Sequence, residues 1–430
     1  MKFEYMPRSV DKILEERVES IGAVLIAGPK WCGKTTTAEQ QAKSVLKLQD
    51  PDKTLGYLET ANVKPSLLLA GKNPRLIDEW QMAPVLWDAV RHAVDMRGET
   101  GLFILTGSTS IDESSIMHSG TGRISRMVMY PMSLYESKES NGLISLIELF
   151  KNPYMEIDGF VSNLSVEQLV FSACRGGWPS TLKKRTERAM LFEAKNYVAN
   201  ICESDASTVD GIKRSPERVR AVLQSYARNI STLASDKTIF TDVTSNHMDM
   251  SEPTLHAYIN ALERLYVIED VPAWFPSIRS ATSMRAGKKK GFVDPSIAVA
   301  SLSLSPDTLL MDMNTFGFIF ECLCFRDLKV YSSALGGYVS FYRDRYGLEA
   351  DCVLHLADGR YALIEFKLGS KGIEEGASHL LELDSLIRKA NDEKKARLRE
   401  PSFLMVLTAG EIAYRRKDGV IVVPIGCMRD

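Results

Sequence analysis

Short apolar runs alternate with helix-compatible segments in the first part of the chain. Residues 23–27 (AVLIA) have the composition of a strand buried on both faces, and residues 74–78 and 102–108 predict two further strands. Residues 36–48 contain neither proline nor glycine and predict a helix, while residues 7–20 predict a short amphipathic helix. Strands interleaved with helices in this way indicate an α/β core.

The pattern changes to a helical one from about residue 165. Helices are predicted within 165–210, at 215–230 and at 252–266, the last opened by Ser251 as N-cap with Pro253 in its first turn. A strand at 267–271 follows, and then a basic return formed by Arg285, Lys288, Lys289 and Lys290. This order predicts a winged helix. Because helix 252–266 carries Glu252, Glu263 and a single cation, Arg264, both DNA and protein remain open as its partner.

The last block returns to strands. A helix at 316–328 carries Glu321, and strands follow around 338–343, 350–356 and 361–367. The chain is therefore expected to have four parts: an ATPase-type core at 1–165, a helical lid at 166–210, a winged-helix-like domain at 211–290 and a C-terminal α/β domain at 291–430.

Composition narrows the class of protein. The 430 residues are 45% hydrophobic and 25% charged with a net charge of −2, so a nucleic-acid surface would have to be local. Seven scattered cysteines without a C-x-x-C pair indicate reduced core thiols. No apolar stretch approaches 18 residues and no export signal is visible, so we expect a cytoplasmic protein without a membrane partner.

The stretch Gly28–Thr35 reads G-x-x-x-x-G-K-T between a predicted strand and a predicted helix. Gly28 and Gly33 would let the backbone N–H groups surround phosphates, Lys34 would reach the β- and γ-phosphates, and the Thr35 hydroxyl would bind Mg²⁺. A chance glycine loop is the alternative, but the flanking elements argue against it. We expect ATP to be bound by Gly28, Pro29, Lys30, Trp31, Cys32, Gly33, Lys34, Thr35 and Thr36.

Two strand ends add candidate chemistry to this loop. Asp78 and Glu79 follow a predicted strand, as the Mg²⁺-holding and water-polarising acids of an ATPase would. Thr106 ends the next strand and would contact the γ-phosphate or the attacking water; capping the strand is the alternative. A solvated strand end is the other interpretation of an Asp-Glu pair, and its position after the glycine loop favours the catalytic one.

Arginines beyond the third strand suggest catalysis across a subunit boundary. Arg123 and Arg126 lie where an arginine finger would supply positive charge to a neighbouring nucleotide, which predicts a homo-oligomer. Surface arginines on a loop are the alternative. Arg175, in the turn R-G-G-W-P, is either a second nucleotide sensor or a structural residue.

The C-terminal block carries a second cluster of candidate residues. Glu365 and Lys367 share one face of a strand because side chains alternate, and Asp351 on the preceding strand could lie beside them. This D…E-x-K pattern is typical of restriction-enzyme-like nucleases. Asp351 and Glu365 would bind Mg²⁺, Lys367 would position or deprotonate the nucleophile, and Glu321 could add a ligand. Solvated strand ends on an inactive fold are the alternative.

The order of these motifs resembles a known family. It comprises the glycine loop, the Asp-Glu pair, T-G-S, G-R-I-x-R, Y-P-x-S-L-Y-E, R-G-G-W-P, F-V-D-P, and then Y-R-D-R-Y-G-L-E-A-D and I-E-F-K-L-G. The chain is similar over residues 20–425 to prokaryotic AAA-type ATPases with a C-terminal domain of formerly unknown function. The resemblance implies a winged helix and a restriction-endonuclease-like fold after the ATPase core.

Three functions follow as hypotheses. The first is an ATPase that couples ATP turnover to the handling of nucleic acid, with DNA favoured over RNA. The second is a signalling or defence NTPase whose C-terminal domain binds protein and cuts nothing. The third is a metal-dependent nuclease switched on by ATP.

Overall fold

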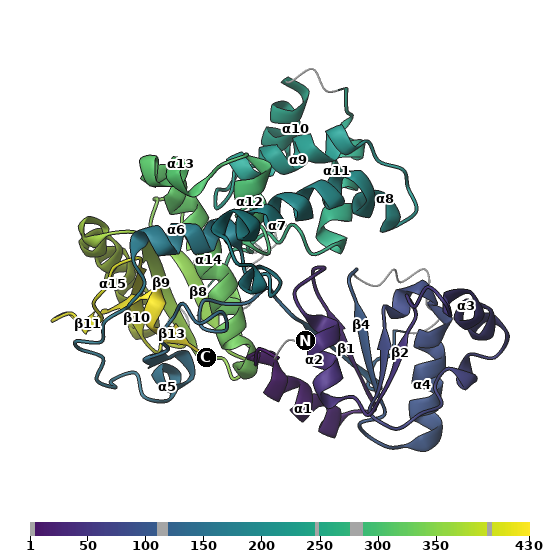
Figure 1. Cartoon of the computed structure of the whole chain (residues 1–430). Coiled ribbons are helices and arrows are strands. Elements are labelled where there is room, and N and C mark those ends of the chain that lie inside the picture. The colour runs from purple at the N-terminus through teal and green to yellow at the C-terminus, as the bar shows by residue number, and fades with distance from the viewer. Residues whose placement is uncertain (1–4, 110–118, 246–248, 276–286, 394–397) are drawn as a thin grey trace. The chain divides into compact units, whose positions relative to one another are not determined.

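The computed structural model of the protein describes residues 5–109, 119–245, 249–275, 287–393 and 398–430. The chain divides into two compact units (Figure 1). The first comprises Met1–Pro131 with Ala261–Tyr266, and the second comprises Met132–Asn260 with Val267–Asp430. Arg285 of the predicted basic return lies outside the described residues.

The first unit is built on a five-stranded parallel sheet in the order β2-β3-β4-β1-β5. Its strands are β1 (Ala23–Ala27), β2 (Ser44–Lys47), β3 (Arg75–Asp78), β4 (Phe103–Gly107) and β5 (Ile124–Val128). Its main helices are α1 (Val10–Ser20), α2 (Lys34–Gln41), α3 (Thr54–Val63) and α4 (Val85–Arg97). Every residue of β1 and β4 is buried, as expected for central strands covered on both faces.

Two elements of this sheet differ from the sequence prediction. The helix expected over 36–48 ends at Gln41, and β2 begins three residues later. Leu46 is buried while Val45 and Lys47 are exposed, so β2 is a half-buried edge strand whose signal was too short to recognise. The sequence predicts no strand for the segment that contains Arg123 and Arg126. It forms β5 at the other edge, anchored by buried Ile124 and Met127.

The second unit opens with helices. They are α5 (Leu146–Lys151), α6 (Val166–Arg175), α7 (Glu187–Asn200), α8 (Ala206–Thr208), α9 (Pro216–Arg228), α10 (Asp236–Ser245), α11 (Glu252–Arg264), which continues into the segment grouped with the first unit, and α12 (Pro295–Ser301). After α11, Ile268 pairs with Phe292 and Val271 with Lys289 in antiparallel bridges. Three helices and a short ribbon have the element order of a winged helix, and that assignment stays a prediction.

A six-stranded mixed sheet forms the C-terminal part, in the order β11-β12-β10-β9-β8-β7. The strands are β7 (Tyr338–Arg343), β8 (Glu349–His355), β9 (Tyr361–Lys367), β10 (Leu404–Thr408), β11 (Tyr414–Arg415) and β12 (Ile421–Pro424); β6 (Ile144–Ser145) and β13 (Met428–Arg429) pair separately. Helix α13 (Pro306–Met311) precedes α14 (Met313–Ser332), which packs on β7 and β9, and α15 (Ser370–Asp392) packs on β8, β9 and β10 (Figure 1). The predicted α/β class is thus confirmed, with a parallel-sheet core, a helical part and a second sheet.

Several motifs without predicted chemistry form one buried network in the second unit, here called the Asp294 hub. Asp294 accepts hydrogen bonds from Gly177 N (2.9 Å) and Ser296 N (2.9 Å) and pairs with Arg326 (3.1 Å). Arg326 also pairs with Asp327 at 2.7 Å, and Asp327 accepts the Leu134 N–H at 3.0 Å. The F-V-D-P, R-G-G-W-P and Y-P-x-S-L-Y-E motifs therefore hold the unit together.

All seven cysteines are free and buried. No helix in the described part of the chain is both long and apolar enough to cross a lipid bilayer.

Candidate nucleotide-binding site and carboxylate cluster

The glycine loop leaves β1 at its carboxyl end with the backbone its sequence requires. Gly28 has φ +143° and Gly33 has φ +106°, values that favour glycine. A Cβ atom at Gly28 would lie 2.3 Å from the Met129 carbonyl oxygen, so the loop approaches the neighbouring backbone too closely for a side chain. Gly33 is the N-cap of α2, which directs free N–H groups of the first turn toward the loop.

Lys34 is folded back onto this loop. Its Nζ donates to the carbonyl oxygens of Gly28 (3.0 Å) and Pro29 (2.7 Å), and the residue is buried. The ammonium group is therefore already positioned inside the loop that would surround a phosphate chain.

The acid at the end of β3 lies beside the loop, because carboxyl ends of parallel strands meet at one edge of a sheet. The Thr35 hydroxyl donates to Asp78 Oδ1 at 2.7 Å, and the Thr106 hydroxyl donates to the same oxygen at 2.5 Å. A hydroxyl and a carboxylate are hard oxygen ligands of the kind that Mg²⁺ prefers. Thr35 and Asp78 therefore have the oxygen ligands that could hold a magnesium ion.

Glu79 follows Asp78 in a left-handed conformation, with φ +56°. Its carboxylate accepts hydrogen bonds from Gln81 Nε2 and from Ser108 Oγ (3.2 Å), and its N–H donates to Thr106 Oγ1 at 3.4 Å. Gln81 and Ser108 were not predicted as site residues. Ser108 ends the T-G-S motif and Gln81 lies two residues after Glu79, but only the folded structure shows that they orient Glu79.

Arg123 and Arg126 lie away from the glycine loop of their own sheet. The Arg123 carbonyl accepts from Ala23 N (3.1 Å) at the amino end of β1, whereas the loop follows the carboxyl end. The Arg123 side chain is half exposed and pairs with Asp95 at 2.6 Å. Arg126 is exposed on edge strand β5, donates to Ser119 O (3.0 Å) and lies 5.2 Å from the Trp87 ring.

The contacts of Arg175 favour the structural role over that of a nucleotide sensor. Its side chain is 5% exposed, pairs with Glu139 and donates from Nε to Gly176 O at 3.0 Å. These partners all belong to the second unit, so the guanidinium group is occupied in holding the R-G-G-W-P turn.

The second cluster gathers at the ends of β8 and β9. Asp351 Oδ2 accepts the Phe366 N–H at 3.0 Å. Lys367 Nζ lies 3.1 Å from Glu365 Oε2, and His379 Nδ1 lies 3.8 Å from Glu365 Oε1. Space for Lys367 comes from Gly372 and Gly376 of α15, since a Cβ there would lie 2.9 Å from Lys367 Cδ or 3.0 Å from its Cε.

A residue that was not predicted for this site, Lys289, completes the cluster. Its Nζ lies 2.7 Å from Glu321 Oε1 and 3.3 Å from Asp351 Oδ1, and its side chain is 8% exposed. The basic run containing Lys289 was visible in the sequence, but it was assigned to the winged-helix return. Nothing in the local sequence links it to acids 32 and 62 residues further on.

Burial and charge shift the protonation of these groups. Burial raises the pKa of Glu365 to about 9, with the Asp351 carboxylate adding to the rise, and burial raises that of Glu321 to about 8. Burial would also raise the pKa of Asp351, but Lys289 and the Phe366 N–H hold it below its ordinary value.

These residues do not fit a divalent cation as they are arranged. Oxygens of Glu321, Asp351 and Glu365 that would bind a metal already contact Lys289, Lys367 or a backbone N–H. In the described ranges, no group of three histidine, cysteine or acidic side chains is arranged to hold a metal ion.

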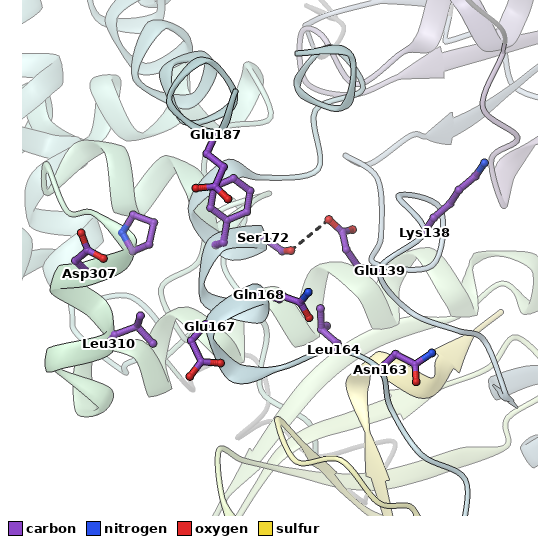
Figure 2. Close-up of a pocket in the computed structure, with 12 residues that line it drawn as sticks. Lys138, Glu139, Asn163, Leu164, Glu167, Gln168, Ser172, Glu187, Asp307 and Leu310 are labelled. Atoms are coloured by element: carbon purple, nitrogen blue, oxygen red, sulfur yellow. Dashed lines mark hydrogen bonds between the residues drawn. The ribbon is translucent and has the colours of Figure 1, made fainter. Parts of the chain in front are cut away.

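A separate pocket of about 620 Å³ lies in the second unit beside α6 and α13 (Figure 2). Its acids Glu167, Glu187 and Asp307 each occupy the first turn of a helix. Their positions are explained by favourable interaction with the helix N-termini, so the pocket by itself indicates no ligand.

Three parts of the chain match known families. Residues 20–138 match the family described as AAA domain. The first part of the chain is therefore similar to AAA-type P-loop ATPases. Residues 166–308 and 316–428 match two domains of unknown function, DUF8612 and DUF4143. An AAA domain followed by a C-terminal domain of this kind is the order that the resemblance implied, and that prediction is confirmed.

Curated relatives and solved structures are distant. The chain is 24% identical over 262 residues to the uncharacterized proteins Mb2031c of Mycobacterium bovis and Rv2008c of Mycobacterium tuberculosis, covering 59% of this chain and 51% of each relative. The chain thus spans about half the length of these relatives. The Walker-type ATPase PABY2304 of Pyrococcus abyssi aligns over 70% of this chain and 99% of its own, at 13% identity and a TM-score of 0.40. A Drosophila ORC structure bound to DNA aligns at 13% identity over 71% of this chain and 84% of its own, with a TM-score of 0.19. At these TM-scores neither structure decides the fold.

Proposed function

We propose that the protein binds ATP with Mg²⁺ and hydrolyses it in its AAA domain. The observation that carries this proposal is the meeting of the glycine loop, Asp78, Thr106 and Glu79 at one edge of the parallel sheet. Each group has the chemistry that phosphoryl transfer to water requires: donors for phosphate, hard oxygens for magnesium and a carboxylate for water.

The roles follow from the contacts. Loop N–H groups and Lys34 would bind the phosphates, the lysine exchanging its carbonyl partners for phosphate oxygens. Thr35 and Asp78 would hold Mg²⁺, which neutralises charge on the β- and γ-phosphates. Glu79, oriented by Gln81 and Ser108, would accept the proton of the attacking water.

Catalysis would be completed in an oligomer. Arg123 lies at the amino end of the parallel strands, and the glycine loop follows their carboxyl end. Arg123 would therefore serve the nucleotide of a neighbouring subunit and not that of its own subunit. Release from Asp95 would free its guanidinium group for the γ-phosphate.

ATP hydrolysis would drive a process carried out by the second unit. We favour handling of nucleic acid, DNA before RNA, through the second unit. The interaction-module hypothesis has one specific observation in its favour, since Lys289 neutralises the cluster that a nuclease would use for metal.

Two substitutions test the ATPase proposal. Lys34→Ala should abolish hydrolysis, because the phosphate-binding ammonium is lost. Glu79→Gln should still bind ATP but hydrolyse it at least about 100-fold more slowly, because only the water-activating carboxylate is removed. Lys43→Ala, an exposed lysine beyond α2, is the matched control and should be unaffected.

The same assay, run with and without single- and double-stranded DNA and RNA, tests the partner. Stimulation by DNA would support nucleic-acid handling, and an unchanged rate with every nucleic acid would favour the interaction module. Normal hydrolysis by Lys34→Ala or Glu79→Gln would refute the assignment of the site itself.

A further inference from the structure

The carboxylate cluster of the second unit contains its own cation. Lys289 Nζ contacts carboxylate oxygens from two elements far apart in sequence, Glu321 on α14 and Asp351 on β8. Such an oxygen-lined position between strand ends and a helix is where a divalent cation would otherwise balance the charge. The ammonium group supplies one positive charge there and needs no metal.

The backbone fixes this lysine in place. Lys289 N donates to Val271 O and Val271 N donates to Lys289 O, both at 2.9 Å, so the residue is held on both sides of one bridge. Lys290, next in the extended chain, points elsewhere, to Asp236 (2.8 Å) and Asp270 (3.0 Å). Lys289 Nζ lies over the Phe341 ring, 5.6 Å from its centre. The backbone and the side chain of Lys289 are therefore both fixed, and the ammonium group is a permanent part of the cluster.

We propose that Lys289 acts as a resident cation that keeps the Glu321–Asp351–Glu365 cluster closed to divalent metal, and that removing its charge converts the cluster into a metal site. Glu365 Oε1 accepts no hydrogen bond from the described residues and has His379 Nδ1 3.8 Å away, so this oxygen could turn to a metal ion once the charge of Lys289 is gone. The DUF4143 part is therefore inactive toward metal while Lys289 is seated. Any metal-dependent cutting of nucleic acid requires that Lys289 leave. This inference does not depend on ATP hydrolysis.

The test is Mn²⁺ binding by the full-length, nucleotide-free protein, measured by electron paramagnetic resonance and by the shift of the unfolding temperature with MnCl₂. Lys289→Met keeps the length of the apolar stem and removes the charge. It should gain one Mn²⁺ site that binds at least about tenfold more tightly than any site of the wild-type protein, because a nearby positive charge has been lost. Lys288→Met, at an exposed lysine one residue earlier, is the matched control and should gain none.

The gained site must map to the cluster. The double variant Lys289→Met/Asp351→Asn should lose it again. A folded Lys289→Met protein that gains no site would overturn the proposal. If Lys289→Met does not fold, Lys289→Gln makes the same test with a polar replacement. A second comparison needs no change at Lys289. If the wild-type protein binds Mn²⁺ at a site that Asp351→Asn removes, Lys289 is not the resident cation.

Discussion

Loss of Asp294 should destabilise the second unit more than loss of any surface carboxylate. Asp294 is fully buried and accepts four hydrogen bonds, from Gly177 N, Ser296 N, Ser296 Oγ (2.6 Å) and Arg326. Asp294→Ala leaves Arg326 with one carboxylate partner in place of two and strands the Gly177 N–H. Breaking a buried ion pair costs about 3–5 kcal/mol, and an orphaned buried donor costs a further ~1–3 kcal/mol.

These terms are not additive, because Arg326 keeps Asp327 at 2.7 Å. We therefore expect a net loss of about 4 kcal/mol in the free energy of unfolding. With a urea m-value near ~3 kcal/mol/M, the midpoint of the second unit's transition should fall by more than about 1 M. Asp294→Asn should lie between wild type and Ala, since it keeps the size of the side chain and one acceptor oxygen.

The assay is urea unfolding followed by circular dichroism, with hydrogen exchange at Gly177 as the local measurement. Protection of that amide should fall in Asp294→Ala because its acceptor is gone. Asp358→Asn is the matched control, since Asp358 is an exposed carboxylate paired with Arg360 at 2.7 Å, and its midpoint should not move. A shift below about 0.3 M for Asp294→Ala, or unchanged protection at Gly177, would refute the idea that Asp294 holds this part of the fold.

Three further predictions concern the nucleotide site and the second sheet. Arg123→Ala protein should be inactive alone but recover part of its ATPase rate when mixed with Lys34→Ala protein; no recovery in exchanging oligomers would contradict action in trans. Gln81→Ala should lower kcat about tenfold with little change in KM, because Glu79 loses an orienting donor; an equal rise in KM would instead indicate weaker binding. Burial lowers the pKa of His355 from its ordinary 6.5 to about 4. The free energy of unfolding that depends on neutral His355 is therefore fully present above pH 6.5 and is lost as the pH falls through 4. Between pH 7 and pH 4 the His355→Phe protein should therefore lose about 3 kcal/mol less of its free energy of unfolding than the wild-type protein, as measured by the urea midpoint at both pH values. An equal pH dependence of the two proteins would contradict this prediction.

The parts of the nucleotide site that the sequence predicts are those encoded locally. Gly28, Gly33, Lys34 and Thr35 lie within one loop, and Asp78 ends a strand. The rule that parallel strands end at one edge was enough to expect them together. β2 was missed because one buried residue, Leu46, carries its apolar signal.

The second cluster shows the limit of sequence reasoning. Strand alternation places Glu365 and Lys367 on one face and suggests Asp351 nearby. It cannot reveal Lys289, whose role depends on a bridge to Val271 and on acids distant in sequence. A lysine in a basic run carries the same local signal whether it faces solvent or enters a carboxylate cluster.

The backbone between the two units is pinned on either side of a single residue. Tyr130 O accepts from Arg8 at 2.8 Å within the first unit, and Met132 N donates to Gly177 O at 2.6 Å within the second. Only Pro131 lies between them, and its ring fixes φ. One freely rotating backbone torsion, ψ of Pro131, therefore lies between these two hydrogen-bonded residues. Within the first unit, the Met129 N–H donates to Ala27 O at 2.8 Å, so the Met129–Tyr130 backbone beside Gly28 is bonded to Ala27 and to Arg8. A side chain at Gly28 would therefore disturb both of these hydrogen bonds as well as the loop itself.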